Sequence, residues 1–315
     1  MTNSNTLRFL IVDKMHPSLT SMLEGIGVNA NHQPDISRVQ IIEQLPAYDG
    51  LVIRSKTFVD KELLASATNL KFICRAGAGI DNLDVAYIES KGIKIINAPE
   101  GNRNALAEHT VGLLFSLLNN IVKADKEVRG LIWDRESNRG HEIVNKTVGI
   151  IGYGHMGSAF VDKMKNFGCR ILVYDKYKSG FAAKGFEEVS LEELFINTDI
   201  LSLHVPLTEE TGSYVDNDFI KNFKKPIWLI NTSRGEVVNT SALIEQIENG
   251  RIIGAALDVL ENEKLNNFTD QQKSNFEYLS NSDKIILTPH IAGWSYESYV
   301  LINKVLIGKL SRELS

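Results

Sequence analysis

Along the first hundred residues, short apolar runs alternate with stretches in which apolar residues recur every three or four positions. Runs rich in Ile, Val and Leu without polar alternation are typical of buried parallel strands. The predicted strands span residues 7–12, 51–53, 71–74 and 93–96, and the predicted helices span residues 18–24, 36–45, 60–66 and 84–90. Gly25 and Gly92 stand at helix ends, where a left-handed cap is expected. This alternation indicates a doubly wound α/β sheet.

The second part of the chain repeats the pattern after one long helical stretch. Residues 103–129 follow Pro99 and Gly101 without any strand signal, so they are predicted to form one helix that bridges two domains. The strands predicted beyond it span residues 146–151, 170–174, 200–203, 227–230, 253–259 and 285–288, and a last helix spans residues 294–313. Ser190, with Glu193 three residues later, has the pattern of a helix capping box.

Composition narrows the class of protein. Of the 315 residues, 43% are apolar and 23% are charged, which is typical of a globular enzyme with room for two domains. The formal charge of -5 is scattered and gives no basic face for nucleic acid or anionic membranes. The two cysteines, Cys74 and Cys169, are too few for a disulfide framework or a cysteine-based metal site. No signal peptide or transmembrane segment is recognisable, so the cytoplasm is the expected location.

A glycine-rich loop follows the strand at residues 146–151. The sequence Gly152-Tyr-Gly154-His-Met-Gly157 leads into a helical pattern that stops at Gly168. In such a loop the first glycine permits a tight turn, the second lets the backbone approach a pyrophosphate, and the third lets the helix pack on the strand. A bare G-x-G-x-x-G pattern can be a packing turn, but its place between strand and helix favours dinucleotide binding.

An acidic residue closes the next predicted strand. Asp175 lies eighteen residues after Gly157, close to the spacing expected for a carboxylate on the adenosine ribose. A carboxylate there would repel a 2′-phosphate, which favours NAD over NADP as the cofactor. Lys176 and Lys178 follow and could weaken that preference. The alternative is that Asp175 only caps a turn.

Three further polar segments follow buried strands, at residues 203–206, 231–235 and 289–294, where ligands of doubly wound sheets bind. The chain contains, in this order, the segments GYGHMG, LHVPLTEET, NTSRGEVV, GAALDV and TPHIAG. Together they resemble the D-isomer-specific 2-hydroxyacid dehydrogenase family, and the resemblance covers nearly the whole chain. The resemblance implies a NAD-binding Rossmann domain inserted into a flavodoxin-like substrate domain. The residues predicted to bind NAD are Gly152, Gly154, His155, Met156, Gly157, Asp175, His204, Val205, Pro206, Thr232, Ser233, Asp258 and Gly293.

The same resemblance implies a catalytic arginine, glutamate and histidine. Arg234 matches the arginine, whose guanidinium can hold a substrate carboxylate through two parallel hydrogen bonds. His290 matches the histidine, and an imidazole that titrates near neutrality can supply or accept the proton that accompanies hydride transfer. The other six histidines are expected to have no chemistry of their own.

Glu263 matches the glutamate by its offset of five from Asp258. Paired with His290, it would orient the ring and raise the imidazole pKa. The family usually has proline after this glutamate, whereas Lys264 follows here, and the segment at residues 262–283 is longer than usual with a polar stretch at residues 266–274. Glu261 is therefore kept as the alternative.

Residues 52–57 and 75–82 resemble phosphoglycerate dehydrogenases within the family. The residues predicted to bind substrate are Arg54, Ser55, Gly77, Ala78, Asn102, Arg234 and His290. Arg54 and Lys56 would suit a phosphate at the far end of the substrate, although Lys56 could equally be a solvated charge. Trp294 stands where many relatives have a small residue, and it could narrow the pocket or cover the histidine ring.

These features predict a substrate domain at residues 1–99 and 291–315 and a NAD domain at residues 100–290, with the substrate meeting NAD between them. Family members are usually dimers, so a homodimer is expected, with the helix near residues 103–122 and its flanks in the contact. Phosphoglycerate dehydrogenases often carry a C-terminal domain that senses serine, and feedback of that kind is not expected here because the sequence stops after the last predicted helix.

The favoured activity is oxidation of D-3-phosphoglycerate to 3-phosphohydroxypyruvate for serine synthesis. A glyoxylate, hydroxypyruvate or other 2-ketoacid reductase is the near alternative. From a different class, the corepressors that look like this family suggest a protein that senses NAD without turnover.

Overall fold

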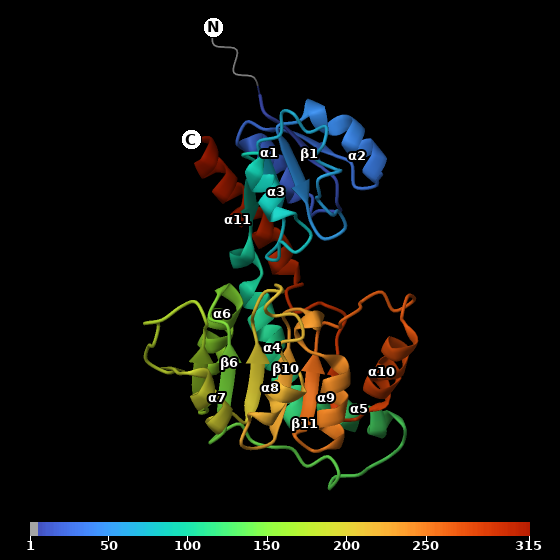
Figure 1. Cartoon of the computed structure of the whole chain (residues 1–315), viewed down its shortest axis with the longest axis vertical. Coiled ribbons are helices and arrows are strands. Elements are labelled where there is room, and N and C mark those ends of the chain that lie inside the picture. Colours follow the sequence, from blue (N-terminus) through green and yellow to red (C-terminus); the bar gives the residue numbers. More distant parts are fainter. Residues whose placement is uncertain (1–5) are drawn as a thin grey trace. The chain divides into compact units, whose positions relative to one another are not determined.

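The computed structural model describes residues 6–315, which divide into two compact units (Figure 1). The first unit contains the chain up to Arg103 together with Trp294–Ser315, and the second contains Asn104–Gly293. The second unit is therefore an insertion in the first. The predicted boundaries, after residues 99 and 290, lie a few residues away.

The first unit is built on a five-stranded sheet in the order β2-β1-β3-β4-β5, with every neighbouring pair parallel. This is the flavodoxin-like order, with helices on both faces. Its strands are β1 (Arg8–Ile11), β2 (Asn29–His32), β3 (Gly50–Ile53), β4 (Phe72–Arg75) and β5 (Lys94–Asn97). Its helices are α1 (Ser18–Gly25), α2 (Arg38–Gln44), η1 (Leu45–Ala47), α3 (Val85–Ser90), η2 (Pro99–Gly101) and α11 (Tyr296–Leu314). Buried residues of α1 and α11 pack on one face of the sheet, and those of α2 and α3 pack on the other.

One strand of this unit was not predicted, and two expectations for it are wrong. The polar edge strand β2 was not predicted, because an edge strand with one partner needs no apolar run. Residues 60–66 form turns in place of a helix, since backbone bonds from Leu64 to Asp60 and from Ala65 to Glu62 span different numbers of residues. Gly25 is the last residue of α1, and the left-handed glycine is Gly27, with φ +78°.

The second unit contains a seven-stranded parallel sheet in the order β12-β11-β10-β9-β6-β7-β8. Its strands are β6 (Thr147–Ile151), β7 (Arg170–Tyr174), β8 (Glu187–Glu188), β9 (Ile200–Leu203), β10 (Ile227–Asn231), β11 (Ile252–Leu257) and β12 (Ile285–Leu287). Its helices are α4 (Arg103–Leu118), α5 (Ile121–Arg129), α6 (His155–Met164), α7 (Leu191–Asn197), α8 (Asn217–Lys221), η3 (Gly235–Val237), α9 (Thr240–Glu248) and α10 (Asp270–Asn281).

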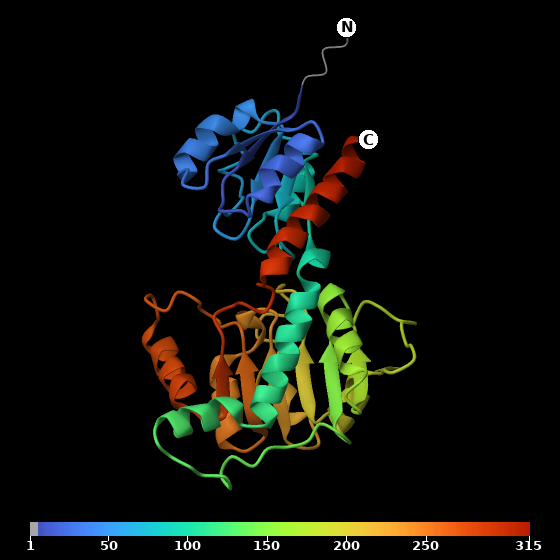
Figure 2. The same ribbon diagram turned by 180° about the vertical axis from the view of Figure 1, so that it is seen from behind.

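Buried side chains cover both faces of this sheet. Those of α4 and α6 pack on one face, which Figure 2 shows from behind, and those of α7, α8, α9 and α10 pack on the other. The strand order is that of a Rossmann fold, which reverses direction between β6 and β9. The predicted fold class is confirmed, and ligands of such sheets bind beyond the carboxyl ends of the strands near this reversal.

The prediction of a single long helix at residues 103–129 is wrong. It divides into α4 and α5, which meet at an angle of 63°. Asn120, between them, has a left-handed φ of 52°, a conformation that asparagine tolerates better than most residues. No single helix in the described residues is long and apolar enough to cross a membrane, and only the bent pair α4 and α5 meets that criterion by length and composition together.

Candidate active site

The loop after β6 is shaped by its three glycines. Gly152 has φ +98°, and a Cβ there would lie 2.4 Å from the carbonyl oxygen of His204. A Cβ on Gly157 would lie 1.9 Å from the carbonyl oxygen of Gly152, so the first turn of α6 packs directly on the loop. A Cβ on Gly154 would meet nothing within 4 Å. The loop is thus closed against the protein at two glycines and open at the third.

The N-terminus of α6 lies beside this opening. Gly154 is its N-cap residue, and no side chain caps the helix. Amides in the first turn of a helix, here those of His155, Met156 and Gly157, have no partner within the helix and carry the positive end of its dipole. Space above Gly154 and uncapped amides beside it fit the pyrophosphate of a dinucleotide.

The two glycines allow a matched test of this fit. We expect Gly154→Ala to keep the fold but to weaken NADH binding roughly tenfold or more, because the methyl group fills the space above the loop. Gly157→Ala is expected to cost about 1–3 kcal/mol of stability, because its methyl group overlaps the backbone of Gly152. Thermal unfolding and NADH fluorescence titration separate these effects. Full NADH affinity in Gly154→Ala would contradict the site.

Asp175 follows β7 and ties the loop to the neighbouring strand. Its Oδ2 accepts from the amide of Tyr153 at 2.7 Å, and its Oδ1 accepts from the amides of Tyr177 and Lys178 at 2.9 and 3.0 Å. These bonds give the carboxylate a role in the loop's structure, and its contact with the ribose stays a prediction.

Both lysines after Asp175 have partners in the structure. The ammonium of Lys176 contacts the carboxylate of Glu210, and that of Lys178 donates to the carbonyl oxygen of Tyr153 at 2.8 Å. Neither is therefore a free cation poised for a 2′-phosphate. The charge arrangement agrees with NAD as the cofactor.

His204 lies beneath the glycine loop at the end of β9. Its amide donates to the carbonyl oxygen of Ile151, and its Nε2 lies 2.9 Å from Ser202 Oγ. Burial lowers the pKa of His204 to about 3, so the ring is neutral at physiological pH. Its Nδ1 is buried without a hydrogen-bond partner among the described residues. His204 is suited to support the loop, and the expectation that it has no proton chemistry agrees with its burial.

Arg234 lies just beyond β10, between the strand and η3. Asn231 holds the turn, because its Nδ2 donates to the carbonyl oxygen of Arg234 at 2.8 Å and its Oδ1 accepts from Ser233. A Cβ on Gly235 would lie 1.9 Å from the carbonyl carbon of Leu260, so this turn packs on the segment after β11. Arg234 is thereby placed next to the loop that carries Glu263.

His290 lies beyond β12 in a left-handed conformation, with φ 55°. A residue with a side chain pays about 1–3 kcal/mol for such a backbone, so the surrounding structure must enforce it. The buried Asp258 does this: its carbonyl oxygen accepts from the amide of His290 at 2.7 Å. Its carboxylate accepts from Thr288 Oγ1 at 2.6 Å and from the amides of Ile291 and Ala292 at 2.9 and 2.8 Å.

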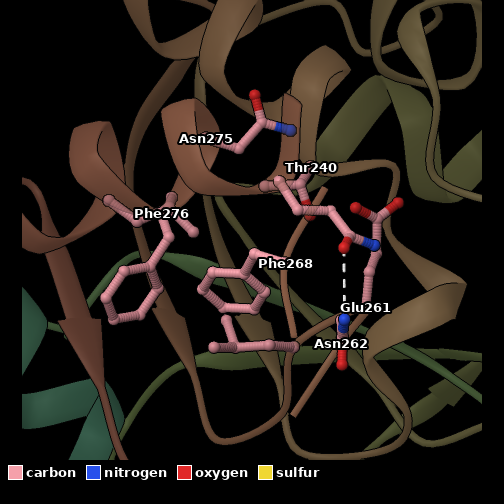
Figure 3. A pocket seen from close by; sticks show the side chains of 9 residues that line it. Thr240, Glu261, Asn262, Phe268, Asn275 and Phe276 are labelled. Atoms are coloured by element: carbon pink, nitrogen blue, oxygen red, sulfur yellow. Dashed lines mark hydrogen bonds between the residues drawn. The ribbon is translucent and has the colours of Figure 1, made fainter. Parts of the chain in front are cut away.

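The imidazole of His290 meets the carboxylate of Glu263. Its Nδ1 lies 2.9 Å from Oε1 and 3.0 Å from Oε2, and each side chain is 47% exposed. Glu261, the alternative, lines a small pocket with Thr240 and Asn262 (Figure 3). The contact with His290 therefore favours Glu263, whose catalytic role stays a prediction.

The other residues predicted to contact NAD also follow strands of this sheet. Val205 and Pro206 follow β9, Thr232 and Ser233 follow β10, Asp258 follows β11, and Gly293 follows β12. The sequence did not single out Asn231, which holds the Arg234 turn, or Thr288, which bonds Asp258. Polar residues at strand ends were the available signal for both.

The predicted substrate residues Arg54, Ser55, Gly77, Ala78 and Asn102 all belong to the first unit, as does Trp294. The guanidinium carbon of Arg54 lies 3.7 Å from the centroid of the Trp294 ring. Trp294 therefore covers Arg54. Asn102 Oδ1 is a buried acceptor with no hydrogen-bond partner among the described residues.

Lys56 has a different setting from Arg54. Its ammonium donates to the carbonyl oxygen of Pro34 at 3.2 Å and is exposed, which agrees with a solvated surface charge.

This unit combines a Rossmann sheet, a loop that fits a pyrophosphate, and a histidine–carboxylate pair beyond neighbouring strands of the same sheet. That arrangement is typical of a dinucleotide-dependent oxidoreductase. The family model described as D-isomer specific 2-hydroxyacid dehydrogenase, NAD binding domain, matches residues 111–292. The chain belongs to this family of NAD-dependent oxidoreductases.

Individual relatives span several activities. A D-3-phosphoglycerate dehydrogenase of Archaeoglobus fulgidus is 31% identical over 95% of this chain and 56% of its own length. A hydroxypyruvate reductase of Thermotoga maritima is 32% identical over 96% of each chain. The crystal structure of a D-lactate dehydrogenase from Aquifex aeolicus with NAD and lactic acid has a TM-score of 0.84 and 27% identity, covering 97% of this chain and 95% of that one. This chain thus spans about half the length of the phosphoglycerate dehydrogenase that it matches.

Proposed function

We propose that the protein interconverts a D-2-hydroxy acid and its 2-keto acid with NAD(H), and that its substrate pair is D-3-phosphoglycerate and 3-phosphohydroxypyruvate, which would place it in serine synthesis. The main support for this proposal is the contact of His290 Nδ1 with the carboxylate of Glu263 at 2.9 Å. Both residues follow strands of the sheet that also carries the glycine loop.

Bound at that loop, NAD would accept the hydride from C2 of the hydroxy acid. Glu263 fixes one nitrogen of His290, which leaves Nε2 to take the hydroxyl proton during oxidation and to return it during reduction. The carboxylate of Glu263 also stabilises the imidazolium that forms. Arg234 holds the substrate carboxylate and polarises the adjacent carbonyl through its guanidinium.

Arg54 supports a substrate with a second anionic group. Its guanidinium carbon stacks on Trp294 at 3.7 Å and lies 5.3 Å from the ring centroid of Tyr299. Burial lowers the pKa of Arg54, an effect that the neighbouring Tyr299 and the carboxylate of Asp13 oppose. A desolvated guanidinium held by aromatic rings is suited to bind phosphate. The other predicted substrate residues, Ser55, Gly77, Ala78 and Asn102, remain part of this proposal.

A second candidate is hydroxypyruvate reductase, because the relative with that name matches this chain over 96% of both lengths. Hydroxypyruvate has no phosphate, so Arg54 would bind a phosphate group of the substrate only if the first candidate is right.

A panel of keto acids tests the proposal. We expect NADH oxidation, followed at 340 nm, to be most efficient with 3-phosphohydroxypyruvate and slower with hydroxypyruvate, glyoxylate and 2-ketoglutarate. Arg54→Gln should lower kcat/KM for the phosphorylated substrate about 10- to 100-fold, or about 1.4–2.7 kcal/mol, and leave hydroxypyruvate nearly unchanged. Preference for hydroxypyruvate in the wild-type protein would favour the second candidate. NADH binding without any turnover would favour a sensor.

We also propose a homodimer through α5 and the residues after it. Apolar side chains are exposed along this segment: Ile121, Val122, Val128, Leu131, Ile132 and Trp133. Leu131 is 96% exposed and Trp133 is 81% exposed. Large apolar side chains gathered in one exposed segment are typical of a protein interface.

A further inference from the structure

We propose that Asn262 is a positioning residue, which holds Glu263 against His290 by fastening the loop to α10. The inference rests on the proposed function, because it assigns Glu263 a role in that reaction. The amide side chain of Asn262, next to Glu263, takes part in three hydrogen bonds.

Asn262 encloses Glu263 in a tight turn. Its Oδ1 accepts from the amide of Lys264 at 2.9 Å, so the residue between them is Glu263. Proline at position 264 would have no amide hydrogen for this bond. The Nδ2 of Asn262 donates to the carbonyl oxygen of Asn267 at 3.0 Å and to Gln272 Oε1 at 3.1 Å. The side chain of Asn262, which precedes Glu263, is thus bonded to three residues that follow Glu263.

Gln272 is a firm anchor because it belongs to the cap of α10. Its Oε1 also accepts from the backbone amide of Thr269 at 3.1 Å, and the backbone amide of Gln272 donates to Thr269 Oγ1 at 3.2 Å. These reciprocal bonds form the capping box that begins the helix. The bond from Asn262 to Gln272 is the dashed line in Figure 3.

α10 is in turn fixed to the body of the unit. The buried Asn275 donates to Ser241 Oγ at 3.0 Å, which joins α10 to α9. The rings of Phe268 and Phe276 lie 5.4 Å apart and line the small pocket beneath the loop (Figure 3). The longer segment after Glu263 therefore forms a support that reaches from α9 to Asn262.

Such a support matters because the contact between Glu263 and His290 is half exposed, at 47% for each side chain. An ion pair in contact with solvent gains little by itself and does not hold two side chains in one geometry. The alignment then depends on the backbone that presents each side chain. Asp258 fixes the backbone at His290, and Asn262 does the same at Glu263.

The test is Asn262→Ala, measured by steady-state kinetics and by nitrogen-15 NMR of labelled histidines. We expect kcat to fall about tenfold, while KM and the dissociation constant of NADH stay within about twofold, because alignment is lost and binding is kept. In the wild-type protein the neutral ring of His290 should carry its proton on Nδ1, facing Glu263. In Asn262→Ala it should shift toward the Nε2–H tautomer. The loss of signals in His290→Ala assigns the ring.

Matched variants separate alignment from general damage to the loop. Asn266→Ala changes an exposed residue of the same segment and should match the wild-type protein in both measurements. Gln272→Ala removes the bond to α10 and leaves the turn bond from Lys264 to Asn262, so it should lose less than Asn262→Ala. The double variant should lose no more than Asn262→Ala, because the two residues share that bond. Asn262→Asp keeps the acceptor for Lys264 but loses both donors, so an intermediate loss is expected.

The outcomes distinguish this inference from the proposed function. Wild-type kcat and an unchanged tautomer in Asn262→Ala would overturn the positioning role. Equal losses in Asn262→Ala and Asn266→Ala would overturn it as well. If no keto acid is turned over by the wild-type protein but the tautomer still changes in Asn262→Ala, the support of Glu263 stands and the proposed reaction falls.

Discussion

Replacing His290 with alanine is expected to lower kcat about 10²- to 10⁴-fold, the range that a positioned acid–base group contributes. The loss follows because Glu263 occupies Nδ1 and only Nε2 remains to exchange the substrate's proton. NADH affinity should stay within about twofold, since the pyrophosphate is proposed to bind the uncapped amides at the N-terminus of α6, to which the imidazole does not belong. Stopped-flow reduction of the best keto acid, together with NADH fluorescence titration, measures both quantities.

His141→Ala is the matched control for this experiment. His141 belongs to the same unit and is exposed, with its ring edge against Trp228 at 5.0 Å between centroids. Its replacement should leave turnover unchanged. If His290→Ala binds NADH poorly and turns over normally when saturated, the acid–base role is wrong.

The sheets could be predicted from the sequence because buried parallel strands need apolar side chains on both faces. β7 and β9 were predicted with their observed bounds, and both lie inside the seven-stranded sheet. β2 and β8 escaped prediction because they lie at sheet edges and carry the polar sequences NANH and EE. Apolar patterning indicates burial, so it finds the edge strands β5 and β12, which contain Ile-Ile, and misses edge strands made of polar residues.

The break between α4 and α5 shows a second limit. The pattern of residues 103–129 is compatible with one helix, and only Asn119 and Asn120 interrupt it. Asparagine lowers helix propensity by well under 1 kcal/mol, which does not decide between a continuous and a bent helix. The left-handed Asn120 is fixed by tertiary contacts, among them the bond from its Nδ2 to the carbonyl oxygen of Arg139.

The candidate site was predicted as a set of residues, and its geometry was not. Resemblance singled out His290 and Glu263, and their contact at 2.9 Å agrees with that choice. The left-handed backbone of His290 and the four hydrogen bonds of Asp258 that stabilise it involve residues 30–34 positions apart. Such bonds depend on how β11 and β12 pair, which no local pattern encodes.

Arg234 provides the other large expected effect. Arg234→Ala should lower kcat/KM roughly 30- to 5,000-fold, because the substrate carboxylate would lose its hydrogen-bonded cation. This corresponds to a loss of about 2–5 kcal/mol of transition-state stabilisation. Arg234→Lys should recover only part of this, since an ammonium cannot make two parallel bonds to a carboxylate. Arg139→Ala removes an equal charge from an exposed pair with Glu136 and should have no effect.

The dependence on the substrate's charge decides what Arg234 does. With the methyl ester of the same keto acid, the wild-type protein and Arg234→Ala should have similar and low kcat/KM, because the ester has no carboxylate to hold. Added guanidinium ion should partly restore Arg234→Ala with the free acid only, since it can occupy the vacated space and make the same two bonds. Asn231 fixes the turn through the carbonyl oxygen of Arg234, so the backbone stays in place when the side chain is removed. Equal losses with acid and ester would mean that Arg234 acts on the fold, and the proposed grip on the carboxylate would then be wrong.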